Sequence, residues 1–179
     1  AEYTINHTID YILEGIYKAK PDVLCFSCYI WNLDYVEQLM DEYHKICPEV
    51  PIWVGGPEVS YETEAFLKEH PQVTGVMVGE GEETFLELCE SYAKAGIGEM
   101  AEKMNLSGIK GIMYRAGESL VKTGAREPLD LNRIPFCYGA SKISGTASSI
   151  MNRAEGVRSG AATVFRRWKR RCGSGMWSG

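Results

Sequence analysis

Residues Ile52 to Phe85 read IWVGGPEVSYETEAFLKEHPQVTGVMVGEGEETF, and this stretch decides the fold. Two short apolar runs each end in a glycine-rich turn, and a segment with helical spacing follows each turn. Upstream, DVLCFSCYI (22–30) is an unbroken apolar run of strand length, which is typical of a strand buried on both faces. Strands alternating with helices through short loops predict an α/β domain with a parallel, doubly wound sheet.

The helical segments are recognised by apolar residues that recur on one face. They cover NHTIDYILEGIYKAKP (6–21), with Thr8 as its N-cap, NLDYVEQLMDEYHKICP (32–48), SYETEAFLKEH (60–70) and EETFLELCESYAKAG (82–96). Further on, IKGIMYRAGESLVKTG (109–124) predicts two strands around an Ala116–Gly117–Glu118 turn, which is a β-hairpin. REPLDLNRIPFC (126–137) is a proline-punctuated linker.

These segments divide the chain into three parts: an α/β domain over residues 1–104, a hairpin with its linker over 105–138, and a tail over 139–179. A domain of this kind usually opens with a strand and a helix, and no such unit precedes Ala1, so we expect the first βα unit to be missing. The tail carries 8 basic and 1 acidic side chains and has little periodicity, which favours a disordered segment.

Composition restricts the function classes. Residues 1–138 carry 11 basic and 23 acidic side chains, which argues against nucleic acid as a partner. No apolar run approaches the roughly 18 residues of a membrane span, and the first residues do not resemble a signal peptide. We therefore expect no membrane partner. Cys25 and Cys89 lie inside apolar patterns, as reduced thiols of a protein core do, so we also expect a cytoplasmic protein.

Three strand ends form the candidate site, because ligands of doubly wound sheets bind beyond the carboxyl ends of the strands. Neither glycine-rich turn matches a phosphate-binding motif, no lysine or arginine lies in the loops, and glutamates would repel a polyphosphate. A neutral ligand with many amide donors suits carboxylates, a serine hydroxyl and loop carbonyls better. The predicted cofactor-binding residues are Ser27, Cys28, Tyr29, Gly55, Gly56, Pro57, Glu58, Gly79, Glu80, Gly81 and Glu82.

Each of these features also has a purely structural interpretation. A glycine after a strand is often only a turn, and Tyr29 and Trp31 could pack against a flat ligand or cap the core. Cys25 and Cys28 are three apart on an extended strand and so face opposite sides, which disfavours a shared metal ion. The histidines show no metal-ligand spacing, and we assign neither a metal site nor a catalytic residue.

Taken together, KPDVLCFSCYIWNLDYVEQL, PIWVGGPEVSYETEAFL, GVMVGEGEETFLEL, the hairpin and LDLNRIPF resemble one family. These are the cobalamin-binding domains of cobalamin-dependent radical S-adenosylmethionine enzymes, which include methyltransferases and the anaerobic magnesium-protoporphyrin monomethyl ester oxidative cyclase. The resemblance covers about residues 1–138 and implies a flavodoxin-like sheet of order 2-1-3-4-5 with the corrinoid over the strand ends. The D-x-H-x-x-G signature, whose histidine ligates cobalt in methionine synthase-like domains, is absent.

The resemblance also implies partners beyond this chain. In the intact enzyme a radical domain would hold a [4Fe–4S] cluster and S-adenosylmethionine, and the corrinoid would carry a methyl group or assist radical chemistry. Without the C-x-x-x-C-x-x-C cluster motif, this chain is expected to be inactive by itself. The competing function class is a flavodoxin-like module that binds a nucleotide, a nucleotide sugar or a protein partner, as a receiver domain does.

The basic tail has a genetic interpretation. Shifting the reading frame by one base after about Gly139 permits a string containing cysteines in the C-x-x-x-C-x-x-C spacing. Our hypothesis is that a one-base shift replaced the start of a radical domain, and sequencing the encoding DNA tests it. On this interpretation the Arg/Lys cluster near the C-terminus is no nucleic-acid site.

Overall fold

The computed structural model describes residues 3, 6–95, 104–128 and 162–165, the last four by their backbone only. In chain order, the elements are α1 (Ile9–Ala19), β1 (Val23–Ser27), α2 (Leu33–Ile46), β2 (Ile52–Gly55), α3 (Pro57–Ser60), α4 (Thr63–Glu69), β3 (Gly75–Met77), α5 (Glu82–Ala95), η1 (Leu106–Gly108), β4 (Ile112–Ala116), β5 (Ser119–Lys122) and β6 (Ala162–Phe165). The predicted boundary at 138/139 and most of the tail lie outside the described residues.

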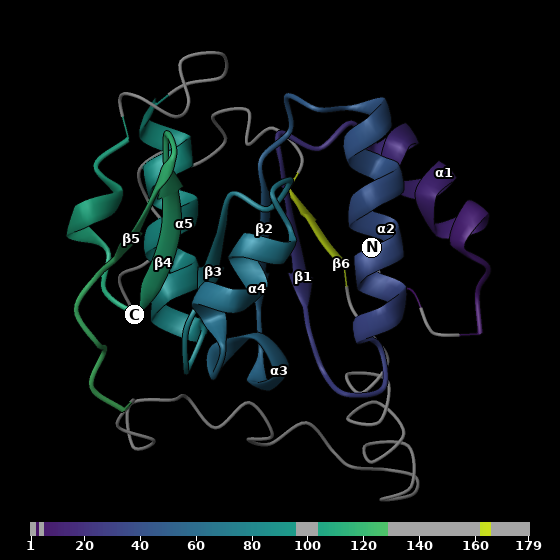
Figure 1. Ribbon diagram of the computed structural model, residues 1–179. Helices are drawn as coiled ribbons and strands as arrows, with labels where there is room; N and C mark the ends of the chain where they lie inside the picture. The colour runs from purple at the N-terminus through teal and green to yellow at the C-terminus, as the bar shows by residue number, and fades with distance from the viewer. Residues whose placement is uncertain (1–2, 4–5, 96–103, 129–161, 166–179) are drawn as a thin grey trace, which may run out of the picture.

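The described strands form one sheet of order β5-β4-β3-β2-β1-β6 (Figure 1). Its centre is parallel, as predicted: β1 pairs with β2, and β2 pairs with β3. These three strands follow one another in the sheet in the same order as in the chain. The two edges are antiparallel, because the β4–β5 hairpin joins β3 and β6 joins β1. The chain therefore has a flavodoxin-like α/β fold with a mixed sheet.

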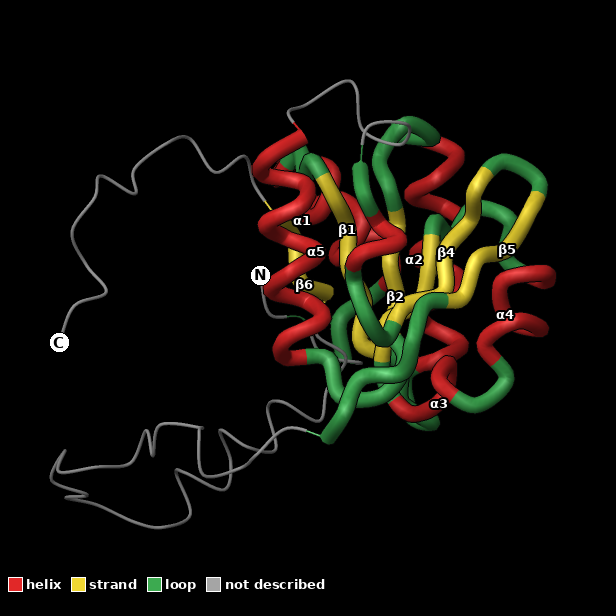
Figure 2. The backbone as a smooth tube through the Cα atoms, turned by 90° about the vertical axis from the view of Figure 1, so that its left-hand side faces the viewer, coloured by secondary structure: helices red, strands yellow, loops and turns green. Residues whose placement is uncertain are grey.

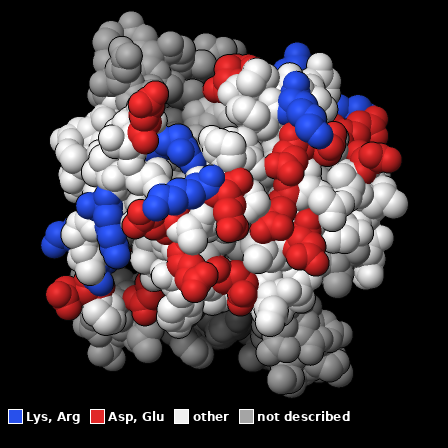
Figure 3. Space-filling model, in the orientation of Figure 1, with Lys and Arg blue, Asp and Glu red and all other residues white. Residues whose placement is uncertain are grey.

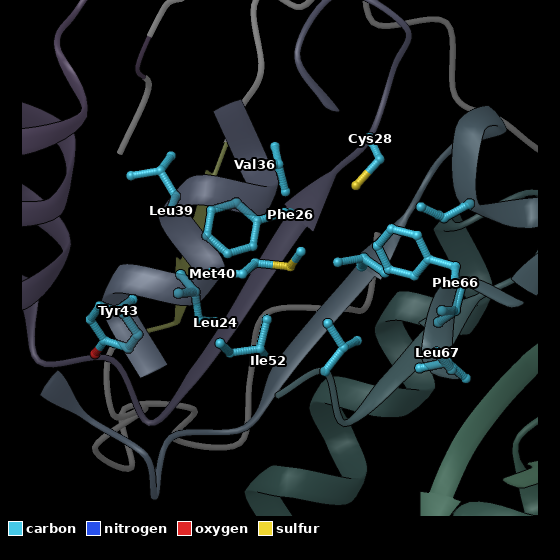
Figure 4. Packing of buried hydrophobic residues seen from close by; sticks show 14 of the residues in the cluster. Leu24, Phe26, Cys28, Val36, Leu39, Met40, Tyr43, Ile52, Phe66 and Leu67 are labelled. Carbon is cyan, nitrogen blue, oxygen red and sulfur yellow. The ribbon is translucent and has the colours of Figure 1, made fainter. Parts of the chain in front are cut away.

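Two layers of helices cover the two faces of the sheet. Buried residues of α1, α2, α3 and α4 share one apolar cluster with Leu24, Phe26, Ile52 and Val54 of the sheet. Figure 4 shows Leu24, Phe26 and Ile52 close to Met40 of α2. The opposite face is covered by α5 and η1, and Figure 2 shows α4 and α5 on opposite sides of the strands. Burial of each large apolar side chain contributes about 1.5–3 kcal/mol.

The pattern of burial confirms the interpretation of the first strand. Val23, Leu24, Cys25 and Phe26 of β1 are all buried, and alternate residues join opposite clusters. Thr8 caps α1 as predicted, since its hydroxyl accepts a hydrogen bond from the Tyr11 N–H at 3.3 Å. The predicted hairpin is also confirmed, with Ala116 opposite Ser119 across the turn.

The helix predicted over residues 60–70 is confirmed as α4, but it begins only at Thr63. The sequence did not predict the short helix α3, which ends at Ser60 and is separated from α4 by Tyr61 and Glu62. The Ser60 hydroxyl donates to the Gly56 carbonyl at 2.7 Å, and the Thr63 hydroxyl donates to the Val59 carbonyl at 2.8 Å. Side chains that bond the local backbone in this way compete with the helical ladder, so a short helix directly after the glycine turn ends before the next begins.

The expectation for the tail also needs one amendment. Ala162–Phe165 form β6, which pairs with β1 in the register Val23 to Phe165 and Phe26 to Ala162. Four residues of a segment expected to lack regular structure thus lie in the sheet. The frame-shift hypothesis concerns the DNA and stays a prediction.

Candidate functional site

The loops after β1, β2 and β3 meet in one cleft of about 780 Å³ at the carboxyl edge of the parallel strands. This convergence follows from the topology, because parallel neighbours place their carboxyl ends at the same edge. The lining residues are Cys25, Phe26, Ser27, Tyr29, Gly55, Gly56, Pro57, Ser60, Tyr61, Met77, Val78, Gly79, Glu80, Gly81, Glu82 and Phe85.

The first loop, Ser27 to Asn32, is held by a buried asparagine at its end. The Asn32 side-chain amide donates to the Ser27 carbonyl at 2.9 Å, and its oxygen accepts from the Tyr29 N–H at 2.7 Å. Asn32 is 2% exposed, so these bonds are shielded from water. The loop conformation that brings Ser27 and Tyr29 to the cleft is therefore set by a residue outside the predicted site.

The second loop packs directly against the first. The Cys28 N–H donates to the Gly55 carbonyl at 2.6 Å, and Gly56 has φ +113°. A Cβ atom on Gly56 would lie 2.4 Å from the Cys28 carbonyl oxygen. Gly56 is thus needed for contact between two loops of the protein, which is the structural interpretation of this glycine.

The third loop, Gly79 to Glu82, is different. Gly79 has φ +81°, yet no atom lies within 4 Å of the position of a Cβ on Gly79 or Gly81. These glycines therefore leave open space at the cleft. Ser60 connects this loop to the second one, since its hydroxyl accepts from the Gly79 N–H at 3.2 Å and donates to the Gly56 carbonyl.

Glutamates give the cleft its electrostatic character. Glu80 and Glu82 line it, and Glu82 and Glu83 form the first turn of α5, where the helix dipole favours carboxylates. Glu58 lies in the first turn of α3 and is exposed, and it is not among the lining residues. A carboxylate rim repels a polyphosphate and accepts hydrogen bonds from amides.

The thiols near the cleft are held in the protonated form. Cys25 and Cys28 belong to opposite core clusters, as their spacing predicted. Burial is the main cause that raises the pKa of the Cys28 thiol to about 12, and burial also raises the pKa of Cys25. At neutral pH neither is a thiolate, the form that attacks electrophiles and binds metals.

Aromatic side chains border the cleft on two sides. The rings of Tyr29 and Trp31 stack with centroids 4.8 Å apart and planes 8° from parallel. Tyr29 lines the cleft, and Trp31 is 46% exposed. Tyr61, between α3 and α4, also lines it and is 90% exposed. Both earlier alternatives for Tyr29 and Trp31 thus remain, because the stacked pair lies outside the buried core but beside the cleft.

The structure brings together most of the residues predicted from strand ends. All line the cleft except Glu58 and Cys28, whose side chain is buried in the core. Sequence reasoning missed the other lining residues, namely Cys25, Phe26, Ser60, Tyr61, Met77, Val78 and Phe85. The sequence did offer a signal for Ser60. It lies four residues after Gly56, and a serine hydroxyl can donate to the backbone carbonyl four residues before it.

Residues 1–89, which include all three loops, match the family model of the B12 binding domain. Residues 1–89 are a B12-binding domain. The match begins at the first residue and ends within α5, so it covers the parallel strands and the cleft. The resemblance drawn from the sequence motifs is thereby confirmed.

Relatives of this B12-binding domain occur in larger proteins. The chain is 34% identical over 152 residues to the 2-(S-pantetheinyl)-carbapenam-3-carboxylate methyltransferase of Streptantibioticus cattleyicolor, covering 80% of this chain and 21% of that protein. It is 27% identical over 135 residues to the cobalamin-dependent radical SAM methyltransferase TokK of Streptomyces tokunonensis, covering 75% and 19%. It is 22% identical over 134 residues to the anaerobic magnesium-protoporphyrin IX monomethyl ester cyclase of Cereibacter sphaeroides, covering 70% and 21%.

The chain thus spans about a fifth of the length of these relatives. It is homologous to cobalamin-dependent radical SAM enzymes and has a cobalamin-binding role. Across the described residues, no helix is long and apolar enough to span a membrane. The face seen in Figure 3 carries Asp and Glu over much of its centre, interspersed with Lys and Arg. That distribution differs from the continuous basic surface with which proteins bind nucleic acid.

Proposed function

We propose that the cleft formed by the three loops holds the corrinoid and presents it to a radical SAM domain of the intact protein. The observation that carries this proposal is the convergence of three strand-end loops on one cleft whose rim offers hydrogen-bond acceptors. Cobalamin supplies a methyl group or assists radical chemistry when it is bound. The residues of this chain bind and orient it, while the [4Fe–4S] cluster and S-adenosylmethionine belong to the radical SAM partner, in the cytoplasm.

The described residues fit a corrinoid in two respects. Phe26, Met77 and Phe85 provide apolar surface inside the cleft, and the open positions at Gly79 and Gly81 leave space for a large ring. The periphery of a corrin carries amide groups, which need acceptors as well as donors. Glu80, Glu82, Ser27 and loop carbonyls at the strand ends would accept from those amides.

Each loop would have its own part in holding the ring. The second loop is rigid because Gly56 packs against Cys28, so it would form a fixed wall. The third loop has open space beside it and would face the ring most closely. Tyr29 would add a flat apolar surface at the first loop, where it stacks on Trp31. By analogy with its longer relatives, we expect this chain to bind the cofactor without catalysing a reaction alone.

A binding experiment with two matched leucine variants tests this function. The purified chain is mixed with hydroxocobalamin, desalted, and its visible spectrum is recorded. Gly81→Leu fills the open side of the cleft, and we expect at least tenfold weaker binding. Glu69→Leu is the control, because Glu69 is exposed at the end of α4 and lies outside the cleft. Neither position has a positive φ, so both variants should keep the stability of the parent chain.

The outcomes separate the function classes. Corrinoid absorbance that the parent chain and Glu69→Leu retain and Gly81→Leu loses supports the proposal. A colourless parent chain, including one extended at its N-terminus, would contradict it. Saturable binding of ADP or a nucleotide sugar with the same variant pattern would favour the competing nucleotide-binding module instead.

A further inference from the structure

Arg126 follows the hairpin and reaches back to the start of α5. Its side chain is 14% exposed, and its guanidinium forms ion pairs with Glu83 and Glu87. The Nη1 atom lies 2.9 Å from a Glu83 carboxylate oxygen, and Nε donates to the Thr84 hydroxyl at 3.0 Å. Charge-assisted bonds in such a sheltered place are stronger than exposed ion pairs. Arg126 therefore attaches the segment after the hairpin to α5.

Thr84 connects this attachment to the cleft. Its side chain is fully buried, and its hydroxyl lies 3.5 Å from the Glu80 carbonyl and 3.4 Å from the Lys110 carbonyl. Because Arg126 donates to the hydroxyl oxygen, the hydroxyl hydrogen is directed to one of these carbonyls. Glu80 belongs to the third loop and lines the cleft. One side chain thus separates Arg126 from the proposed corrinoid site.

Backbone hydrogen bonds through Gly111 make a second connection between the segment after the hairpin and the third loop. The Gly111 carbonyl accepts from the Val78 N–H at 2.8 Å, and the Gly111 N–H donates to the Gly124 carbonyl at 2.8 Å. Val78 is the residue before Gly79 and also lines the cleft. The segment around Gly124 and Arg126 is therefore bonded to both ends of the third loop, through Gly111 at one end and Thr84 at the other.

We propose that Arg126 is a positioning residue which couples the segment after the hairpin to the third loop, so that the placement of this segment regulates corrinoid affinity. The proposal rests on the proposed function of the cleft. Coupling between sites is reciprocal, so occupancy of the cleft would in turn order residues near Arg126. The first two loops are instead bonded to each other and to Asn32.

Affinity measurements on the full chain test the coupling. Arg126→Met keeps the apolar stem and removes the guanidinium, and we expect hydroxocobalamin to bind about fivefold more weakly or worse. Arg126→Lys keeps the positive charge, and its affinity for hydroxocobalamin should lie between those of the parent chain and Arg126→Met. Lys68→Met removes an exposed ion pair with Glu64 on α4, and we expect it to bind like the parent chain.

A double-mutant cycle separates positioning from general destabilisation. Thr84→Val is nearly isosteric and removes the hydroxyl that links Arg126 to Glu80. If Arg126 acts through Thr84, Arg126→Met should cause little further loss of affinity in the Thr84→Val background. An undiminished loss of affinity in that background would overturn the proposal. Should Arg126→Met fail to fold, Arg126→Lys completes the same cycle.

Amide exchange gives a readout that needs no ligand. The Val78 N–H bonds to Gly111, and the Phe85 N–H bonds to the Gly81 carbonyl at 2.7 Å, so both amides report on the third loop. We expect faster exchange at both in Arg126→Met than in Lys68→Met. Equal exchange would refute the coupling. If the parent chain binds no hydroxocobalamin, the proposed function fails, and this measurement still decides whether Arg126 positions the loop.

Discussion

The second and third loops begin with similar sequences, VGGPE and VGEGE, but the structure uses their glycines differently. Gly56 has backbone of the first loop 2.4 Å from its Cβ position, whereas Gly79 and Gly81 have no atom within 4 Å. The second loop is therefore part of the packed protein, and the third loop faces open space. Glycines after strands can thus serve packing in one loop and ligand access in the next, even within one cleft.

Substitution of the positive-φ glycine in each of these two loops should give the largest contrast in stability. Gly56→Ala combines an unfavourable φ with a clash against the Cys28 carbonyl, so we expect a loss of about 3 kcal/mol in the free energy of unfolding. Gly79→Ala has the unfavourable φ but no clash, and should lose only about 1 kcal/mol. Urea unfolding followed by circular dichroism measures both. Equal losses would show that the two loops are packed alike.

Ser60 tests whether the two loops act together. Ser60→Ala removes the hydroxyl that donates to the Gly56 carbonyl and accepts from the Gly79 N–H, and we expect a loss of about 1–2 kcal/mol. Because the bond to Gly79 also holds the third loop, hydroxocobalamin affinity should fall as well. Urea unfolding and a visible titration give the two values. Ser107→Ala, at an exposed site in η1 outside the cleft, is a control for which neither value should change.

The Cys28 thiol tests how closely the first and second loops pack. Its effect on the free energy of unfolding near neutral pH should be the smallest of these predictions. Burial raises its pKa from 9.0 to about 12 in the folded state. The folded state thus holds this proton more tightly, so its contribution to stability is complete below pH 9 and declines as pH rises from 9 toward 12. Peptide mapping after iodoacetamide treatment at pH 8 should find Cys28 unmodified in the native protein and modified in urea. Cys47, which is half-buried, provides the comparison.

Rapid native-state alkylation of Cys28, with the protein still folded by circular dichroism, would contradict the close packing of the first two loops. It would also remove the reason for a rigid second loop in the proposed function. Alkylation of Cys28 that is no faster than global unfolding of the protein agrees with this close packing.

Much of the fold was predictable because it depends on local patterns. The four apolar residues of β1, the N-cap at Thr8 and the turn at Gly117 were each read from adjacent residues. The split between α3 and α4 was not, because helical spacing continues across it while Ser60 and Thr63 bond the local backbone. The pairing of β6 with β1 was likewise not evident from a segment with little periodicity.

The candidate site was predictable to the extent that strand ends locate it. Ser27, Gly55 and Gly79 follow directly from where the apolar runs stop. Ser60 and Arg126 do not, because their decisive partners lie 19 and 42 residues away in the chain. No local pattern reveals that a serine after one loop bonds the backbone of another.

Periodicity and apolar runs in the sequence were enough for the alternating elements, the parallel centre of the sheet and the common edge of the three loops, because hydrophobic burial imposes a regular spacing on neighbouring residues. Which glycine is packed and which is open followed from contacts between segments far apart in the chain. A Cβ on Gly56 would meet Cys28, and a Cβ on Gly79 would meet no atom, although both glycines follow the same kind of strand. Such contacts depend on how whole elements pack, and the spacing of residues within one element does not specify them.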